Sequence, residues 1–143
     1  MKSIIFFIFF IFTSFMGFAQ MDITEAITIL DKPVPPNYTK LNENTFSNDS
    51  FQNGSFLIIT NDSGIVILSQ LGYAFDTESK AKQWLTNFYK TIEDQNWILL
   101  QEYDNEKIYQ KNRIYLLISL PSQNYNGIRA ANIGIAKDLE LLQ

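Results

Sequence analysis

Three acidic side chains gather where one expected strand ends and the next begins. Glu102, Asp104 and Glu106, with Asn105 among them, place oxygen ligands at one hairpin tip. Ca²⁺ and Mg²⁺ take ligands of this kind, and two carboxyl groups about 5–10 Å apart can act as the acid and base of a glycosidase. The segment lacks the spacing and the glycine of an EF-hand loop. We therefore favour solvated turn carboxylates and predict no metal or other cofactor.

Ser63, in the sequence Asp62-Ser63-Gly64, resembles a nucleophile only in its residue type. A serine nucleophile needs a base within hydrogen-bond reach. The chain contains no histidine and no cysteine, so neither a histidine-based triad nor an ordinary zinc site can be built. Only a lysine remains as a base, and an exposed lysine stays protonated at neutral pH. We interpret Ser63 as a turn residue and predict no catalytic residue.

Tyr103, Tyr109 and Tyr115 lie six residues apart on three successive expected strands. If the strand register brings the three rings to the open face of the sheet, they form an aromatic platform for a glycan or a protein partner. Arg113 and Arg129, the only arginines, could add recognition of an anionic group. Cross-strand packing explains the same five residues, and a register slip of one residue turns a ring to the opposite face.

The charge balance is acidic, with 11 basic and 15 acidic side chains and a net charge of −4. A nucleic-acid-binding surface needs a cationic footprint. We therefore predict no nucleic-acid partner.

The first residues have the three parts of a secretory signal peptide. Lys2 gives a positive start, residues 4–18 are mostly apolar, and Gly17 and Ala19 place small side chains at positions −3 and −1 of a cleavage site. Cleavage after Ala19 leaves Gln20 first. The alternative is an uncleaved anchor, the one way in which we expect the chain to contact a membrane, although a spanning helix needs about 20 apolar residues. Without a cysteine the chain has no lipid-attachment site.

The clearest element is an amphipathic helix over residues 77–95. Its apolar residues follow the i, i+3, i+4, i+7 spacing of a wide helical stripe. Asp76 is the expected N-cap, and Asn96 is expected to take the left-handed conformation after the helix. The stripe consists of Ala81, Trp84, Leu85, Phe88, Tyr89 and Ile92.

Strands are expected on both sides of this helix. Residues 22–30 fit a helix or a short strand equally, and residues 37–53 fit an irregular arm. A hairpin with its turn at Asn61–Gly64 precedes the helix, because Asn, Asp and Gly tolerate the left-handed backbone of such turns. The expected strands are 56–60 and 65–68 before the helix, and 97–103, 107–110, 113–120 and 128–136 after it, with a short helical tail at 138–143.

The helix and the later strands each need a partner for their apolar face. We therefore predict an α+β fold in which one main helix packs on an antiparallel sheet: a β-hairpin, the helix, then a meander of three to four strands. The expected organisation is a signal peptide at 1–19, a mostly irregular N-terminal segment at 20–54 and one α+β domain at 55–143.

Residues 73–120 resemble small, uncharacterised bacterial envelope and secreted proteins. In those proteins a helix ending in a Phe-Tyr pair is followed by a Trp and by a hairpin with a basic residue in its turn. The matching residues are Phe88, Tyr89, Trp97 and Lys111. The resemblance implies the helix-and-meander fold and no activity.

Together these features predict an exported, non-catalytic domain that binds a protein or ligand in the bacterial periplasm or outside the cell. Two alternatives remain open. One is a small envelope hydrolase that uses carboxylates such as Glu102 and Asp104, and the other is a purely structural envelope component. The first hypothesis predicts an exposed apolar or aromatic patch on the sheet face away from the helix, and the hydrolase predicts a cleft with two inward carboxyl groups.

Overall fold

A computed structural model describes residues 22–52, 54–120 and 129–143. The predicted signal peptide and its cleavage site lie outside the described residues. Within the described ranges, no helix is both long enough and apolar enough to cross a membrane.

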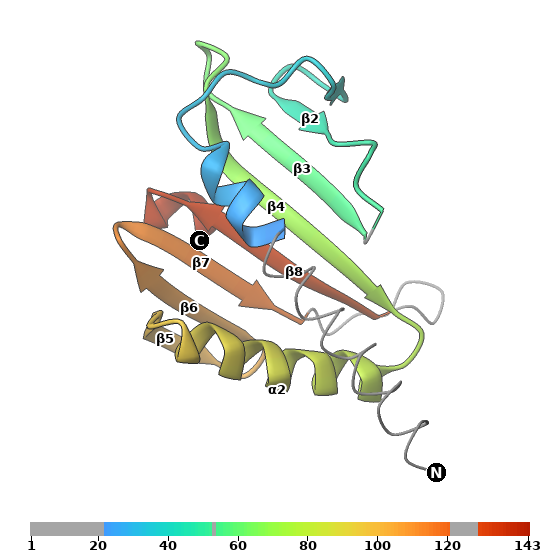
Figure 1. The fold of residues 1–143 in the computed structure, drawn as a ribbon, viewed down its shortest axis with the longest axis vertical. Helices are drawn as coiled ribbons and strands as arrows, with labels where there is room; N and C mark the ends of the chain where they lie inside the picture. Colours follow the sequence, from blue (N-terminus) through green and yellow to red (C-terminus); the bar gives the residue numbers. More distant parts are fainter. Residues whose placement is uncertain (1–21, 53, 121–128) are drawn as a thin grey trace, which may run out of the picture.

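The described chain forms one eight-stranded antiparallel sheet with two α-helices, residues 22–28 and α2, on one of its faces (Figure 1). The order across the sheet is β1-β2-β3-β4-β8-β7-β6-β5. The strands are β1 (Thr39–Lys40), β2 (Thr45–Ser47), β3 (Ser55–Thr60), β4 (Val66–Phe75), β5 (Ile98–Tyr103), β6 (Glu106–Lys111), β7 (Ile114–Ser119) and β8 (Arg129–Ala136).

The main helix, α2 (Glu78–Asp94), forms where the apolar stripe predicts it. Its N-cap is Thr77, whose side chain accepts a hydrogen bond from the Lys80 amide, so the expectation of Asp76 as the cap was wrong. The Asp76 carboxylate instead forms an ion pair with Lys80 at 2.7 Å. Asn96 follows the helix with φ 65°, as predicted for a left-handed residue that ends a helix.

Residues 22–28 form a second, short helix that packs on the same face of the sheet. Its backbone is attached to β4, because the Ser69 hydroxyl donates to the Ala26 carbonyl at 2.9 Å. At the start of the helix, the Tyr73 hydroxyl donates to the Asp22 carboxylate at 2.9 Å. These contacts between distant parts of the chain favour the helix over the strand that the local sequence would equally accept.

The core lies between this covered face and the two helices. Trp84 stacks on Phe88 with ring centroids 4.8 Å apart. The rings of Tyr73 and Phe75 lie 5.0 Å and 5.5 Å from the Trp84 ring. Trp97 also lies in the core, as expected from the sequence. The aromatic cluster thus fixes α2 across the middle of the sheet.

The predicted α+β class is confirmed, but the sheet dominates the fold and its topology differs from the prediction. The strand β8 does not merely end the meander. It pairs with β4 on one side and β7 on the other, and so joins the hairpin and the meander into one sheet. Within residues 20–54, β1 and β2 extend the same sheet beyond β3. The helical tail is present as the 3-10 helix η1 (Leu139–Leu142).

Candidate functional site

The three tyrosines proposed as a platform do not share a face. Tyr109 is fully buried beneath α2, where its hydroxyl donates to the Glu93 carboxylate at 2.9 Å. The reason is the turn length. The β6–β7 hairpin has two turn residues, Asn112 and Arg113, so Tyr109 pairs with Leu116 and Tyr115 pairs with Gln110, and the two rings point to opposite faces. The predicted platform of three rings therefore does not form.

Tyr103 and Tyr115 do lie on the open face, but at opposite ends of the meander. Tyr103 pairs with Glu106, and Tyr115 pairs with Gln110. These two positions are four residues apart along β6, a distance of about 13 Å. The two rings cannot clamp one sugar between them.

The two arginines are also apart. Arg113 is exposed in the β6–β7 turn with φ 63°. Arg129 is buried at the start of β8 and lies 3.8 Å from the Glu78 carboxylate at the first turn of α2. The sequence therefore identified five residues that the fold distributes over two faces and a turn.

The acidic residues of the β5–β6 hairpin do not converge. The Glu102 carboxylate lies 3.1 Å from the Lys107 ammonium, which sits 4.5 Å from the centre of the Tyr89 ring. Asp104 and Glu106 are exposed at the turn. Among the described residues there is no group of three metal-ligating side chains. Ser63 is exposed in the β3–β4 turn, where its amide donates to Asn61.

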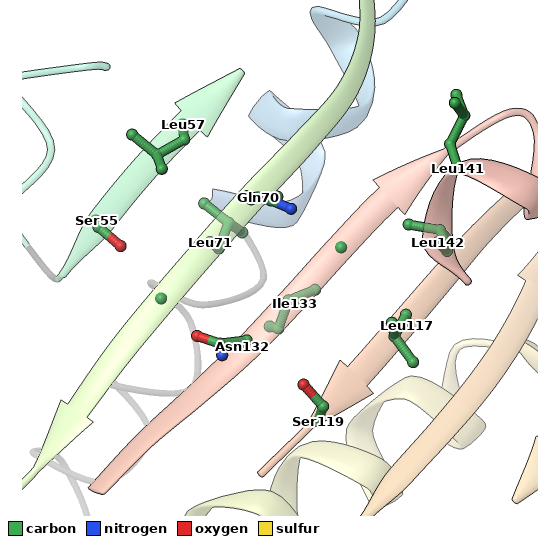
Figure 2. A pocket seen from close by; sticks show the side chains of 12 residues that line it. Ser55, Leu57, Gln70, Leu71, Leu117, Ser119, Asn132, Ile133, Leu141 and Leu142 are labelled. Atoms are coloured by element: carbon green, nitrogen blue, oxygen red, sulfur yellow. The ribbon is translucent and has the colours of Figure 1, made fainter. Parts of the chain in front are cut away.

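A hollow lies on the open face, away from α2 (Figure 2). It has a volume of about 330 Å³ and lies over the centre of the sheet, where β3, β4, β8 and β7 run side by side. We call it the open-face groove. Its lining side chains are Ser55, Leu57, Gln70, Leu117, Ser119, Asn132, Leu141 and Leu142, above the glycines Gly72 and Gly134.

The groove exists because small residues occupy adjacent positions on neighbouring strands. One row across the sheet pairs Ser119 with Asn132, Asn132 with Gly72, and Gly72 with Ser55. The next row pairs Leu117 with Gly134. Side chains at these positions are too short to fill the space above the sheet, so a depression remains.

Both glycines are closely approached. A Cβ atom on Gly72 would lie 2.5 Å from the Ser55 hydroxyl, and one on Gly134 would lie 2.9 Å from a Leu142 methyl group. The C-terminal helix η1 therefore rests against the bare backbone of β8. Leu141 and Leu142 form an apolar wall at this end of the groove (Figure 2).

The polar side chains of the groove are available to a ligand. Ser55, Gln70, Ser119 and Asn132 line it. None of the four side chains forms a hydrogen bond with another described residue. Of the residues that the structure describes, no lysine, arginine, aspartate or glutamate lines the groove. Its walls are apolar and its polar groups are neutral.

A second hollow of about 210 Å³ lies on the covered face, between residues 22–28 and the end of α2. Its walls include Ile27, Ile92 and Trp97. Lys111 closes one side and donates from its ammonium to the Gln95 carbonyl at 2.6 Å. This lysine thereby satisfies one of the carbonyls left free where α2 ends.

Sequence reasoning did not find the open-face groove. The sequence of β4 does contain an indication of it, because small residues alternate there with large ones: Gly72 and Ala74 alternate with Leu71 and Tyr73. The groove forms because β8 pairs with β4 and places its own small residues beside those of β4. Periodicity within one strand cannot predict that pairing.

Comparison with family models, with curated proteins and with solved structures gives no significant match for this chain.

Proposed function

We propose that this chain is an exported, non-catalytic binding domain whose open-face groove binds a small, uncharged, amphipathic ligand. The observation that carries the proposal is the groove itself, about 330 Å³ in volume, with leucine walls and four hydrogen-bonding side chains that have no described partner. Ligand sites in proteins combine apolar walls with a few polar groups that fix orientation.

The lining determines the chemistry of the ligand. Leu57, Leu117 and Leu142 would contact an apolar body. Ser119 and Asn132, neighbours across β7 and β8, can together donate to and accept from hydroxyl, amide or carbonyl groups. A charged ligand would lose its hydration without gaining a partner of opposite charge, which is costly. A neutral molecule with one polar edge therefore fits best.

The same geometry gives little support to the hydrolase alternative. Its carboxylates, Glu102 and Asp104, are exposed on the β5–β6 hairpin. Within the part of the chain that the structure describes, neither of the two hollows is lined by an acidic residue. A purely structural role in the envelope does not explain why polar side chains without a partner line a hollow.

Export is supported by the sequence of the first 19 residues and has a direct test. The full coding sequence is expressed in a bacterial host, and the mass of the protein recovered outside the cytoplasm is measured. A protein that begins at Gln20 would support export, and a full-length protein retained in the cytoplasm would refute it.

Binding is tested with the neutral fluorescent probe N-phenyl-1-naphthylamine, together with mass spectrometry of small molecules that co-purify with the native protein. We expect saturable binding by the wild type. Ser119→Phe fills the groove and should weaken binding at least about tenfold, which corresponds to about 1.4 kcal/mol.

The matched control is Thr45→Phe. Thr45 lies on the open face at β2, outside the groove, so the same added ring should leave the affinity unchanged. If the wild type binds neither the probe nor a co-purified molecule, or if both variants weaken binding equally, the groove is not the ligand site.

A further inference from the structure

The strand β5 ends the sheet with an apolar edge. Four of its six residues are large apolar or aromatic side chains exposed to solvent: Ile98 at 66%, Leu99 at 39%, Leu100 at 42% and Tyr103 at 61%. Among the described residues no strand pairs with its outer side. A free edge of this length offers unpaired backbone groups to another strand.

The opposite edge is protected. It is formed by β1, which has only two residues, Thr39 and Lys40. Short edge strands and lysine side chains are the usual ways in which proteins prevent edge-to-edge pairing. The contrast indicates that the β5 edge is kept open.

A bulge in β5 sets which side chains share a face. Leu99 pairs with Tyr109 and Gln101 pairs with Ile108, so Leu100 is an extra residue without a partner in β6. In a regular strand Ile98 and Tyr103, five residues apart, would point to opposite faces. The bulge brings both to the open face.

We infer that β5 pairs antiparallel with β5 of a second copy of this chain, about a two-fold axis between Leu100 and Gln101. Ile98 of each copy then lies opposite Tyr103 of the other, and Leu99 opposite Glu102. In this register both of these pairs match face to face, which they could not do without the bulge. Glu102 does not meet its own equivalent, and the two exposed Leu100 side chains flank the axis.

Charge supports the antiparallel orientation. Asp104 and Glu106 lie at the turn that ends β5, while Lys111 and Arg113 lie at the end where β5 begins. Asp104, Glu106 and Arg113 form no ion pair with a described residue. An antiparallel pair brings Asp104 and Glu106 of one copy toward Lys111 and Arg113 of the other, whereas a parallel pair would bring the two acidic turns together.

The natural absence of cysteine allows a direct test of the register. Ile98→Cys and Tyr103→Cys proteins are purified separately, and disulfide formation under mild oxidation is compared for each alone and for the mixture. We expect the mixture to form a mixed disulfide at least about tenfold faster than either variant forms a disulfide alone. In the proposed register, residue 98 of one copy lies opposite residue 103 of the other, whereas the two copies of residue 98 lie five residues, about 17 Å, apart along the strands. A faster disulfide within the Ile98→Cys protein alone, or no disulfide in the mixture, would overturn the proposal.

Association is measured independently by sedimentation of the wild type between 1 and 500 μM, concentrations at which about micromolar affinities are resolved. We expect a reversible dimer, with Leu100→Lys weakening it at least about tenfold. Leu41→Lys is the matched control, because Leu41 is 56% exposed beside the opposite edge. Circular dichroism checks that each variant is folded. A monomeric wild type at all concentrations, or equal effects of the two lysine variants, would also refute the inference.

The charge argument has its own test. Arg113→Glu should weaken the dimer, and adding Asp104→Lys to it should restore the affinity. A double variant that is weaker than the single variant would show that the two ends do not meet.

Discussion

The two faces of the sheet carry opposite kinds of side chain along the same strands. On the covered face β4 presents Leu71 and Tyr73 to the helices, and on the open face it presents Gly72. On β8, Ile133 faces the core and Gly134 faces the groove. Since successive residues alternate between faces, one strand supplies packing on one side and space on the other. Stability and the ligand binding that we propose for the open-face groove can therefore be changed separately.

The largest difference should come from removing a large side chain on each face. Phe88→Ala opens a cavity beside Trp84 and should lower the free energy of unfolding by about 3–5 kcal/mol. Leu117→Ala, on the half-buried open face, should cost about 1 kcal/mol. Urea unfolding followed by circular dichroism measures both. Equal losses would mean that the open face also supports the fold.

A second comparison removes one hydroxyl from each face. Tyr73→Phe leaves the buried Asp22 without the 2.9 Å hydrogen bond that it accepts and should cost about 1–3 kcal/mol. Tyr115→Phe removes only a 3.5 Å contact with the Gln110 amide and should cost less than about 0.5 kcal/mol. The same unfolding measurement tests both variants. A larger loss for Tyr115→Phe would reverse the comparison.

A third effect is confined to alkaline solution. Burial, with a smaller contribution from Glu102, raises the pKa of Tyr89 to about 12. Burial and the Asp22 carboxylate raise the pKa of Tyr73 as well. The tyrosines of the unfolded chain lose their protons near pH 10, while those of the folded chain retain them. The stabilisation that results should therefore be fully present below pH about 10, and the free energy of unfolding should fall as the pH rises toward 12.

Urea midpoints at pH 9 and pH 11 provide the measurement. The midpoint should be lower at pH 11, and Tyr73→Phe should show a smaller drop than the wild type. An unchanged midpoint in the wild type would contradict the assignment of these tyrosines to a buried face.

The smallest effect concerns the floor of the groove. Gly134→Ala places a methyl group against Leu142 and should displace η1, with a change in stability below about 1 kcal/mol. Gly72→Ala meets only the Ser55 hydroxyl, which can rotate away. Carboxypeptidase should therefore digest the C-terminus faster in Gly134→Ala than in Gly72→Ala. Equal rates would show that η1 does not depend on the bare backbone of β8.

Local sequence predicted the elements well where one face is strongly apolar. The helical stripe from Ala81 to Ile92 places five buried residues on one side of α2, and Asn61–Gly64 forms the turn between β3 and β4 as expected. Helices and hairpins of this kind are set by contacts between near neighbours. The α+β class followed from the same patterns.

The candidate site was not predictable in this way. The tyrosine hypothesis depended on strand register, and the two-residue turn at Asn112 and Arg113 turned Tyr109 inward. The groove depended on β8 pairing with β4, which are separated by α2 and three strands in the sequence. No local pattern identifies such a neighbour.

The sequence by itself determined which residues form α2, where the turn between β3 and β4 lies and that no histidine or cysteine chemistry is available. The tertiary structure alone decided that the hairpin and the meander form one sheet, that the small residues of β3, β4, β8 and β7 meet above Gly72 and Gly134, and that β5 remains at an edge. The physical reason is that the periodicity of a segment shows only which of its residues face the core and which face the solvent. Which distant segment lies beside it depends on burying all the apolar faces of the chain at once.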